Sequence, residues 1–140
     1  MADLDPQLGA PGTGVVITGG ASGIGLAAAQ ALAAVGRPVS LWDINAEGAA
    51  AEAAAITARY GVAASGLAVD LRDPQAVIPA ALATRFALGS IGGFVHCAGT
   101  APTTGIDGVT PDNFDAGMAL HVRAIILLAQ AFREDMRANP

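Results

Sequence analysis

The sequence contains no lysine, and all seven of its basic residues are arginines that lie singly along the chain. The formal net charge is −5. Binding to nucleic acid depends on a face of clustered positive charge that neutralises phosphates. Because the arginines form no such cluster, we expect no nucleic-acid partner.

Cysteine and long hydrophobic runs are equally scarce. The single cysteine, Cys97, excludes an internal disulfide. Residues 1–14 show neither the basic start nor the apolar stretch of an export signal. The longest apolar-looking segment, 124–132, contains Gln130 and is shorter than the roughly 20 residues needed to span a bilayer. We therefore expect a cytoplasmic protein that does not associate with membranes.

Aromatic residues make up only 4% of the chain, although hydrophobic residues make up 53%. Small and aliphatic side chains therefore carry the apolar content, which suits tight packing of helices on a sheet. The 140 residues are enough for one domain, since domains average roughly 150 residues. We expect one unit over residues 1–140 that begins with a flexible lead-in over residues 1–13.

Runs that fit strands alternate with segments of helical periodicity. Val15-Val16-Ile17 is a β-branched run without alternation, which is typical of a strand buried on both faces. Apolar residues at helical spacing follow from 23 to 35. The same order recurs, with strands expected over 38–44, 65–70 and 91–97 and helices over 45–60, 73–89 and 111–137. Four consecutive βα units predict an α/β fold, a doubly wound parallel sheet of the Rossmann-like type with helices on both faces.

Capping residues indicate where the helices begin and end. Asn45 fits an N-cap, and Asp73-Pro74 fits an N-cap followed by the first helical position. Gly61 and Gly89 are suited to the ends of the second and third helices. Thr110 and the residues after it predict the start of the long fourth helix.

A glycine-rich turn, Thr18 to Gly25, lies between the first strand and the first helix. Glycines at this place let the backbone turn sharply and approach a pyrophosphate, whose charge then lies against the helix N-terminus. By itself the turn is equally consistent with an ordinary glycine-rich loop. The candidate dinucleotide-binding residues in it are Gly19, Ser22, Gly23, Ile24 and Gly25.

A carboxylate at the end of the second strand changes this balance. Asp43 stands eighteen residues past Gly25, where it can accept hydrogen bonds from both ribose hydroxyls of an adenosine. The carboxylate would repel a 2′-phosphate, and neither Ile44 nor the turn supplies a positive charge. The combination predicts a dinucleotide site that prefers NAD to NADP, with Asp43 and Ile44 in it. We interpret Arg37 as a solvated surface charge.

The spacing Thr18-Gly19-x-x-x-Gly23-x-Gly25 resembles the glycine motif of the short-chain dehydrogenase/reductase family. The resemblance extends from about Gly14 to Arg137. Asp70-Leu71, after the third strand, is similar to the family's adenine-contacting pair. It implies that the Asp70 carboxylate meets the adenine amino group and that the Leu71 backbone N–H meets a ring nitrogen.

Two further segments match the family's motifs only in part. Ala98-Gly99 looks like the end of the Asn-Asn-Ala-Gly motif and implies backbone contact with the cofactor, but His96 and Cys97 replace the two asparagines. We interpret His96 as a core histidine with satisfied hydrogen bonds and Cys97 as a small buried hydrophobe. No spacing of cysteines and histidines suggests a metal site.

His121 is the single candidate for a catalytic role in this chain. The stretch from His121 to Ala124 resembles the family's Asn-Val-x-Gly, whose asparagine is implied to hold a water in a proton relay. A histidine could bridge a water there or simply pack, and packing is the favoured interpretation. The resemblance also implies a homo-oligomer formed through the helix 111–137. An apolar stripe on that helix fits either core or subunit interface: Leu120, Ile125, Leu127, Leu128 and Phe132.

The chemistry of the family requires a serine, a tyrosine and a lysine four residues after the tyrosine. Tyr60 is the only tyrosine, and Ala64 follows it at that spacing. We therefore expect the chain to be the cofactor-binding half of an NAD-dependent oxidoreductase acting on an alcohol or ketone. The end at Asn139-Pro140 favours a fragment over a complete inert homologue, and we expect residues 1–140 alone to be inactive and to self-associate.

Two other functions remain open. A non-catalytic nucleotide-binding or scaffolding subunit is compatible with the two histidines and the absence of lysine. A methyltransferase-like domain would also bind an adenosine on a glycine-rich turn, but the Asp70-Leu71 and Ala98-Gly99 pairs argue against it. The sequence does not indicate the substrate.

Overall fold

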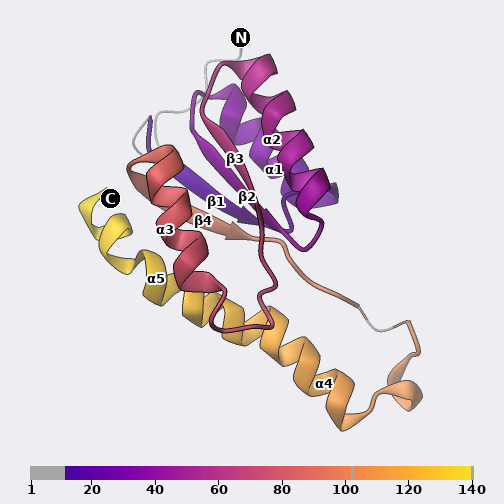
Figure 1. The fold of residues 1–140 in the computed structure, drawn as a ribbon. Coiled ribbons are helices and arrows are strands. Elements are labelled where there is room, and N and C mark those ends of the chain that lie inside the picture. The colour runs from indigo at the N-terminus through magenta and orange to yellow at the C-terminus, as the bar shows by residue number, and fades with distance from the viewer. Residues whose placement is uncertain (1–11, 102, 140) are drawn as a thin grey trace.

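The computed structural model describes residues 12–101 and 103–139 of the chain (Figure 1). Residues 1–11 of the expected lead-in lie outside these ranges. The strands are β1 (Gly14–Thr18), β2 (Val39–Asp43), β3 (Ala64–Ala68) and β4 (Ile91–His96). The helices are α1 (Gly23–Ala34), α2 (Ala46–Tyr60), α3 (Val77–Leu88), the short 3₁₀ turn η1 (Ile106–Gly108), α4 (Pro111–Met118), the π-helical η2 (Ala119–Arg123) and α5 (Ala124–Ala138).

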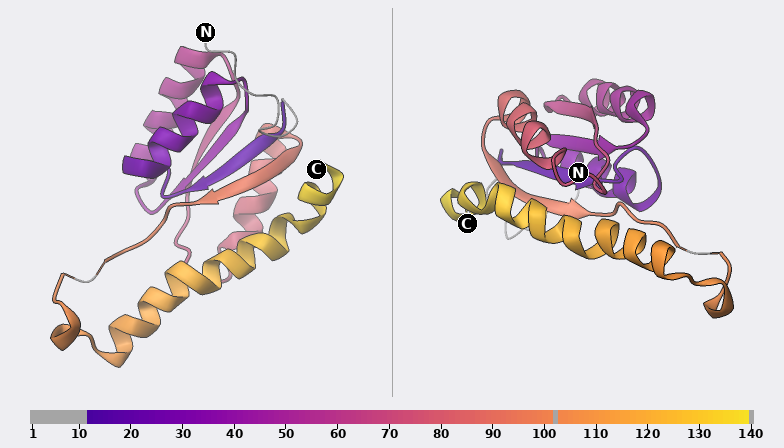
Figure 2. Two further views of the ribbon diagram at one scale, coloured as in Figure 1. Left: turned by 180° about the vertical axis from the view of Figure 1, so that it is seen from behind. Right: turned by 60° about the horizontal axis from the view of Figure 1, so that its bottom comes forward.

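The four strands form one parallel sheet in the order β3-β2-β1-β4. Helices cover both of its faces (Figure 2), so the predicted doubly wound α/β fold is confirmed. The chain adds β2 and β3 on one side of β1 and then returns to place β4 on the other side. Ligands bind at such a reversal in open α/β sheets, beyond the carboxyl ends of the strands.

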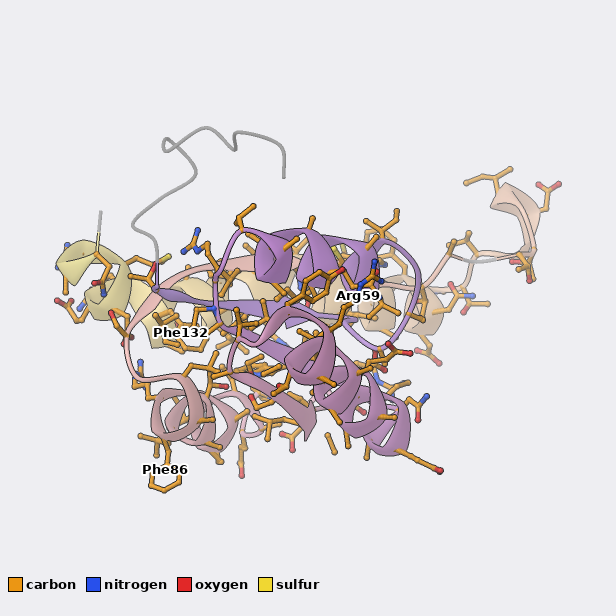
Figure 3. All side chains as sticks on the ribbon, turned by 90° about the horizontal axis from the view of Figure 1, so that it is seen from above. Arg59, Phe86 and Phe132 are labelled. Carbon is orange, nitrogen blue, oxygen red and sulfur yellow. The ribbon has the colours of Figure 1, made fainter. Side chains whose placement is uncertain are left out.

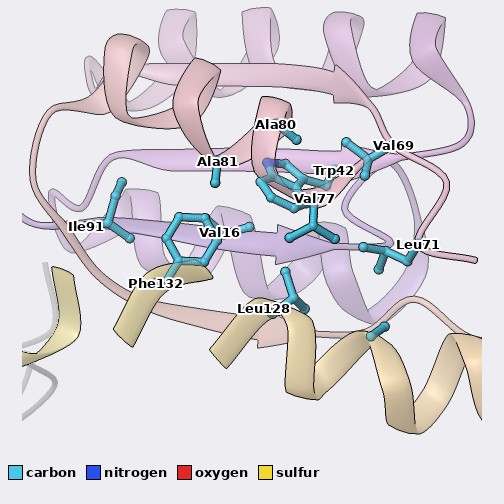
Figure 4. Close-up of a cluster of buried hydrophobic side chains, with 11 residues drawn as sticks. Val16, Trp42, Val69, Leu71, Val77, Ala80, Ala81, Ile91, Leu128 and Phe132 are labelled. Atoms are coloured by element: carbon cyan, nitrogen blue, oxygen red, sulfur yellow. The ribbon is translucent and has the colours of Figure 1, made fainter. Parts of the chain in front are cut away.

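Successive side chains of the central strands point to opposite faces of the sheet and belong to two separate hydrophobic clusters. Val15 and Ile17 point to the face covered by α1 and α2. Val16 and Trp42 point to the face covered by α3 and α5, where the ring centroids of Trp42 and Phe132 lie 5.8 Å apart with the planes tilted by 52° (Figure 4). Both faces of the central strands are therefore buried, as expected for β-branched runs without polar alternation.

Three hydroxyl groups, one each on β2, β3 and α3, form a hydrogen-bond network with the indole of Trp42. The Trp42 Nε1–H donates to Ser40 Oγ at 3.2 Å and to Thr84 Oγ1 at 3.0 Å, and Ser65 Oγ donates to Ser40 Oγ at 2.8 Å. Within residues 12–101 and 103–139 no buried side-chain nitrogen or oxygen lacks a hydrogen-bond partner, which removes the cost of leaving one unpaired. The network attaches α3 and β3 to the strand that ends at the predicted ribose-binding residue.

The capping predictions hold for the second and fourth helices. Asn45 accepts from the backbone N–H of Gly48, and Gly61 ends α2 at a φ of 70°. Thr110 and Asn113 form a reciprocal capping box at the start of α4. These local interactions position the first turn of each helix beside the carboxyl edge of the sheet.

The start of the third helix was predicted three residues too early. The carboxylate of Asp73 accepts from the backbone N–H of Gln75 at 2.9 Å, and Ala76 N–H donates to the Asp73 carbonyl. Such local bonds compete with helix formation. Residues 72–76 therefore form turns, and α3 begins at Val77. The third strand likewise ends at Ala68, before Asp70.

The interpretation of Arg37 as a solvated charge was wrong. Its exposed fraction is 7%. The Nε–H donates to the Thr13 carbonyl at 3.1 Å, and Nη2 donates to Thr13 Oγ1 at 2.8 Å. The guanidinium thereby ties the start of β1 to the turn between α1 and β2.

The long fourth helix is present but not uniform. The π-helical η2 separates α4 from α5, and π-helical segments occur frequently at functional sites. By length and composition alone the run from Pro111 to Ala138 could cross a membrane. Its C-terminal part packs on the sheet through Ala124, Leu128 and Phe132, while only 11% of its most apolar stretch is buried.

The outer face of α3 is unusual because it carries no polar residue. Ile78, Leu82 and Phe86 have exposed fractions of 58%, 60% and 96%. Pro79, Ala83 and Ala87 complete this exposed face. Figure 3 shows Phe86 projecting away from the body, whereas Phe132 points into the interior.

Candidate functional site

A cavity of about 540 Å³ lies at the carboxyl ends of the strands. All eleven residues predicted to bind the dinucleotide line it: Gly19, Ser22, Gly23, Ile24, Gly25, Asp43, Ile44, Asp70, Leu71, Ala98 and Gly99. They come from four loops that are far apart in the sequence. The parallel order of the sheet brings these loops to one edge.

The glycine-rich turn requires its glycines for two reasons. Gly19 and Gly23 have φ values of 65° and 53°, which favour glycine. A Cβ on Gly25 would lie 2.1 Å from the Gly19 carbonyl oxygen. The backbones of Gly19 and Gly25 are therefore in contact, and the absence of side chains there leaves room for a ligand in the cavity.

The N-terminus of α1 opens onto the cavity. Its N-cap, Ser22, makes no side-chain capping hydrogen bond, and the first turn contains no acidic residue. The first N–H groups of a helix have no partner within the helix, and the helix dipole places partial positive charge there. The turn and the helix together can accommodate the charge of a phosphate group.

Asp43 is held in place by backbone N–H groups on both sides. Oδ2 accepts from Ala21 N–H at 3.0 Å, and Oδ1 accepts from Asn45 N–H at 3.0 Å. Each carboxylate oxygen retains acceptor capacity for a further donor. The side chain can thus receive two hydroxyl groups without reorienting.

Asp70 has a partner that the sequence analysis missed. Arg72 donates Nη2 to Asp70 Oδ2 at 2.7 Å, and its backbone N–H and Nε–H both donate to Oδ1. These hydrogen bonds lower the pKa of the Asp70 carboxyl below its usual 3.8. Both side chains line the cavity and are exposed, so an adenine amino group would compete with the Arg72 guanidinium for this carboxylate.

His121 is not one of the described residues that line the cavity. Its ring packs on Gly99, where a Cβ would lie 2.5 Å from His121 Cε1. His121 Nε2 lies 2.8 Å from the Thr100 carbonyl oxygen and 3.3 Å from the Thr100 nitrogen. His121 therefore packs against the loop that follows β4. A role of His121 in proton transfer stays a prediction.

His96 and Cys97 follow the end of β4. His96 is half-buried with hydrogen-bond partners at both ring nitrogens, Thr18 Oγ1 and the Leu120 carbonyl. Cys97 is partly exposed and lines the cavity. Within residues 12–101 and 103–139, no three side chains of His, Cys, Asp or Glu cluster in a way that could hold a metal ion.

The far wall of the cavity was not predicted. It consists of Asn113, Ala116, Gly117 and Leu120 on α4 and η2. Ala116 and Gly117 are small and give the helix no bulk towards the cavity. The capping residue Thr110 indicates where this helix begins. No local pattern in the sequence indicates that α4 and η2 line the cavity at the strand ends.

Comparison with known proteins identifies the family. A family model described as short chain dehydrogenase matches residues 13–140. The chain therefore belongs to the short-chain dehydrogenase family. It is similar to D-threitol dehydrogenase of Mycolicibacterium smegmatis, with 35% identity over 96% of this chain and 50% of the relative. It is also similar to sorbitol dehydrogenase of Cereibacter sphaeroides, with 33% identity over 91% of this chain and 48% of the relative.

Solved structures give the same result. L-sorbose reductase from Gluconobacter frateurii, complexed with NADPH and L-sorbose, superposes with a TM-score of 0.85 at 31% identity, covering 93% of this chain and 49% of that protein. A metagenomic short-chain oxidoreductase in complex with NADP has a TM-score of 0.82 at 32% identity, covering 91% of this chain and 58% of that one. The chain spans about half the length of the curated relatives that it matches.

Proposed function

We propose that this chain supplies the dinucleotide-binding part of an NAD-dependent oxidoreductase that interconverts an alcohol and a ketone by hydride transfer. The observation that carries the proposal is the Asp43 carboxylate, held at the cavity by the N–H groups of Ala21 and Asn45. Bound there, NAD would supply the hydride acceptor. This chain's own residues would hold its adenosine and pyrophosphate.

The fit of a dinucleotide rests on the shape of the site. The Gly25 backbone touches Gly19, and the uncapped start of α1 faces the open space above this contact. Asp43 lies beside that space and Asp70 lines the same cavity. A dinucleotide would place its pyrophosphate at the start of α1, its adenosine ribose at Asp43 and its adenine towards Asp70.

The preference for NAD is proposed from this chain's residues and not from its relatives. The two solved relatives described above were complexed with NADPH or NADP. In this chain a 2′-phosphate would meet the Asp43 carboxylate, and the neighbouring Arg72 is already paired with Asp70. Two like charges in close contact are unfavourable, so NADP should bind more weakly.

The proton-transfer residues are proposed to lie outside these 140 residues. The chain has no lysine, and Tyr60 ends α2 and is not among the residues that line the cavity. The names of two relatives refer to polyols and that of one solved structure to the sugar L-sorbose, which supports a small alcohol or ketone as substrate. We further propose that the protein is cytoplasmic and forms a homo-oligomer. The oligomer is supported by three apolar side chains that are exposed on η2 and α5: Val122, Ile125 and Ile126.

Calorimetric titration of the full-length protein with NAD and with NADP tests the proposal. We expect NAD to bind at least about tenfold more tightly, because one charge repulsion of roughly 1.4 kcal/mol corresponds to that ratio. Equal affinities would remove the role assigned to Asp43. Binding of NAD without turnover of any alcohol or ketone by the full-length protein would favour the non-catalytic subunit instead.

A further inference from the structure

His96 connects three elements at the base of the cavity. It is the last residue of β4. Its Nδ1 lies 2.7 Å from Thr18 Oγ1 at the end of β1, and its Nε2 lies 3.1 Å from the Leu120 carbonyl oxygen in η2. One imidazole ring therefore links the residue before the glycine-rich turn to the far wall of the cavity.

The hydrogen bonds of Thr18 determine which nitrogen of His96 carries the proton. Thr18 Oγ1 accepts from Cys97 N–H and from Ala98 N–H, both at 3.2 Å. Cys97 N–H also donates to the Thr18 carbonyl oxygen at 3.1 Å. A hydroxyl group has two acceptor lone pairs and one proton. With both lone pairs in use, the Thr18 proton points to His96 Nδ1, which must be unprotonated. The proton of the neutral ring then lies on Nε2 and is donated to Leu120.

Water cannot replace these partners easily, because the Thr18 side chain is completely buried. The network also sets how closely the two strand ends approach. A Cβ on Gly19 would lie 2.8 Å from the Ala98 nitrogen, so the glycine-rich turn and the loop after β4 are in backbone contact. Gly19, Ala98 and Leu120 all line the cavity.

We propose that His96 is a positioning residue of this site: as the neutral Nε2–H tautomer it fixes the spacing between the glycine-rich turn and η2, and protonation of its ring weakens dinucleotide binding. The statement about binding rests on the function proposed above. The statement about the tautomer rests on the hydrogen bonds of Thr18 alone.

Protonation would add a second N–H to the ring, on Nδ1, and direct it at an oxygen whose lone pairs are already occupied. Thr18 Oγ1 would then have to release Ala98 N–H or the branch of the Cys97 N–H bond that it accepts, whose other branch goes to the Thr18 carbonyl oxygen. Both residues belong to the loop that lines the cavity. Burial lowers the pKa of His96 below 6.5; the hydrogen bond with Leu120 opposes this shift and the nearby His121 reinforces it. The neutral ring is therefore the form present at neutral pH.

Few other ionisable groups surround this ring among the residues that the structure describes. β1 carries none. Cys97 follows His96 directly, and η2 carries His121 and Arg123. α5 also packs on β4, but its ionisable side chains begin only at Arg133. His121 is the other histidine of the chain and contacts the same loop, so it is the residue to control for.

The tautomer can be measured directly, because the chain has only two histidines. Long-range ¹H–¹⁵N correlation spectra of the ¹⁵N-labelled full-length protein, without dinucleotide, distinguish the two neutral forms. Spectra of His96→Asn and His121→Asn assign the signals. We expect His96 as the Nε2–H form at about pH 7.5. An Nδ1–H form or a mixture of forms would overturn the inference, whether or not the protein binds NAD.

The effect on binding is measured by titrating NAD calorimetrically between about pH 8 and pH 5.5. We expect the wild-type affinity to fall as the pH decreases, by about three- to tenfold once the ring is protonated, the size of one lost hydrogen bond. His96→Asn offers Thr18 an acceptor that does not titrate, so its profile should be flat. His121→Asn should keep the decline.

The same decline in His96→Asn as in the wild type would refute the positioning role. If His96→Asn does not fold, His96→Gln provides a second non-titrating acceptor with a longer reach. If the protein binds no NAD at any pH, the proposed function fails, and the tautomer measurement still decides the structural part of the inference.

Discussion

The carboxylate of Asp43 accepts a hydrogen bond from the backbone N–H of Ala21 at 3.0 Å. This contact joins the end of β2 to the middle of the glycine-rich turn. The group proposed to bind the ribose is therefore attached to the loop proposed to bind the pyrophosphate. A substitution at Asp43 should alter both parts of the site.

Asp43→Ala should weaken NAD binding about 10- to 100-fold, since hydrogen bonds to a charged group contribute about 1.5 to 3 kcal/mol. NADP binding should change less or improve, because the repulsion of its 2′-phosphate is removed. Calorimetry with both dinucleotides measures this. Glu47→Ala is the matched control: it removes a nearby negative charge in the first turn of α2 that does not line the cavity. An equal loss in both variants would contradict a specific role for Asp43.

Gly25→Ala should destabilise the protein by about 3 kcal/mol, because the new Cβ would lie 2.1 Å from the Gly19 carbonyl oxygen and neither backbone segment can yield cheaply. Chemical denaturation measures the free energy of unfolding. Gly93→Ala is the control, since a Cβ at Gly93 in β4 has no heavy atom within 4 Å. It should be neutral or slightly stabilising. A Gly25→Ala variant as stable as the Gly93→Ala variant would show that the turn is not compressed.

Arg85→Ala should lower the free energy of unfolding by about 1 to 2 kcal/mol. The guanidinium joins α3 to α5: it pairs with Asp135 at 2.6 Å, donates to the Ala131 carbonyl and lies 5.3 Å from the Phe132 ring centroid. The side chain is one-third exposed, which limits the effect. Arg133→Ala, which breaks a solvent-exposed pair with Glu134, should leave stability unchanged. A similar loss in both variants would argue against the α3–α5 contact.

The contribution of Asp135 should depend on pH in a defined direction. The hydrogen bonds from Arg85 lower the pKa of the Asp135 carboxyl below its usual 3.8, and partial burial opposes them. A group whose pKa is lower in the folded state stabilises the protein fully above the unfolded pKa and loses that contribution as the pH falls through the folded pKa. The stability difference between wild type and Asp135→Asn should therefore shrink as the pH falls below about 4. A difference that is constant with pH would contradict the ion pair.

The apolar outer face of α3 should promote self-association of residues 1–140. Exposed apolar patches of this kind are uncommon on isolated soluble domains. Replacing Leu82 and Phe86 together by Glu should shift the sedimentation profile towards the monomer. Ile106→Glu is the control, because Ile106 is 85% exposed but lies apart on η1. If the control has the same effect, general hydrophobicity and not the α3 face drives association.

The strand and helix order could be predicted because each βα unit carries its own signals. Val15 to Ile17 is a buried strand without alternation, and Asn45 and Thr110 cap helices whose first turns are visible in the sequence. The cavity follows from this order, because the residues after parallel strands meet at one edge. The predicted dinucleotide-binding residues lie at or just after strand ends and therefore line one cavity, although Asp70-Leu71 and Ala98-Gly99 were predicted from the resemblance to the family.

The contacts that were not predicted depend on distances across the fold. Arg37 is buried because Thr13, more than twenty residues away, reaches its guanidinium. Arg72 turns back onto Asp70 through a local bond that no periodicity reveals. The π-helical η2 has no sequence signal that we recognise. Its Leu120 carbonyl meets His96, a residue on another element.

The position of Trp42 gives this protein an internal optical probe. It is the chain's single tryptophan, it is 1% exposed, and it adjoins Asp43 at the edge of the cavity. Its indole N–H is fixed by Ser40 and Thr84, so its emission should be blue-shifted and arise from one environment. Reduced nicotinamide absorbs light where tryptophan emits. Binding of NADH should therefore quench Trp42 by energy transfer, and occupancy of the site can be followed without any label.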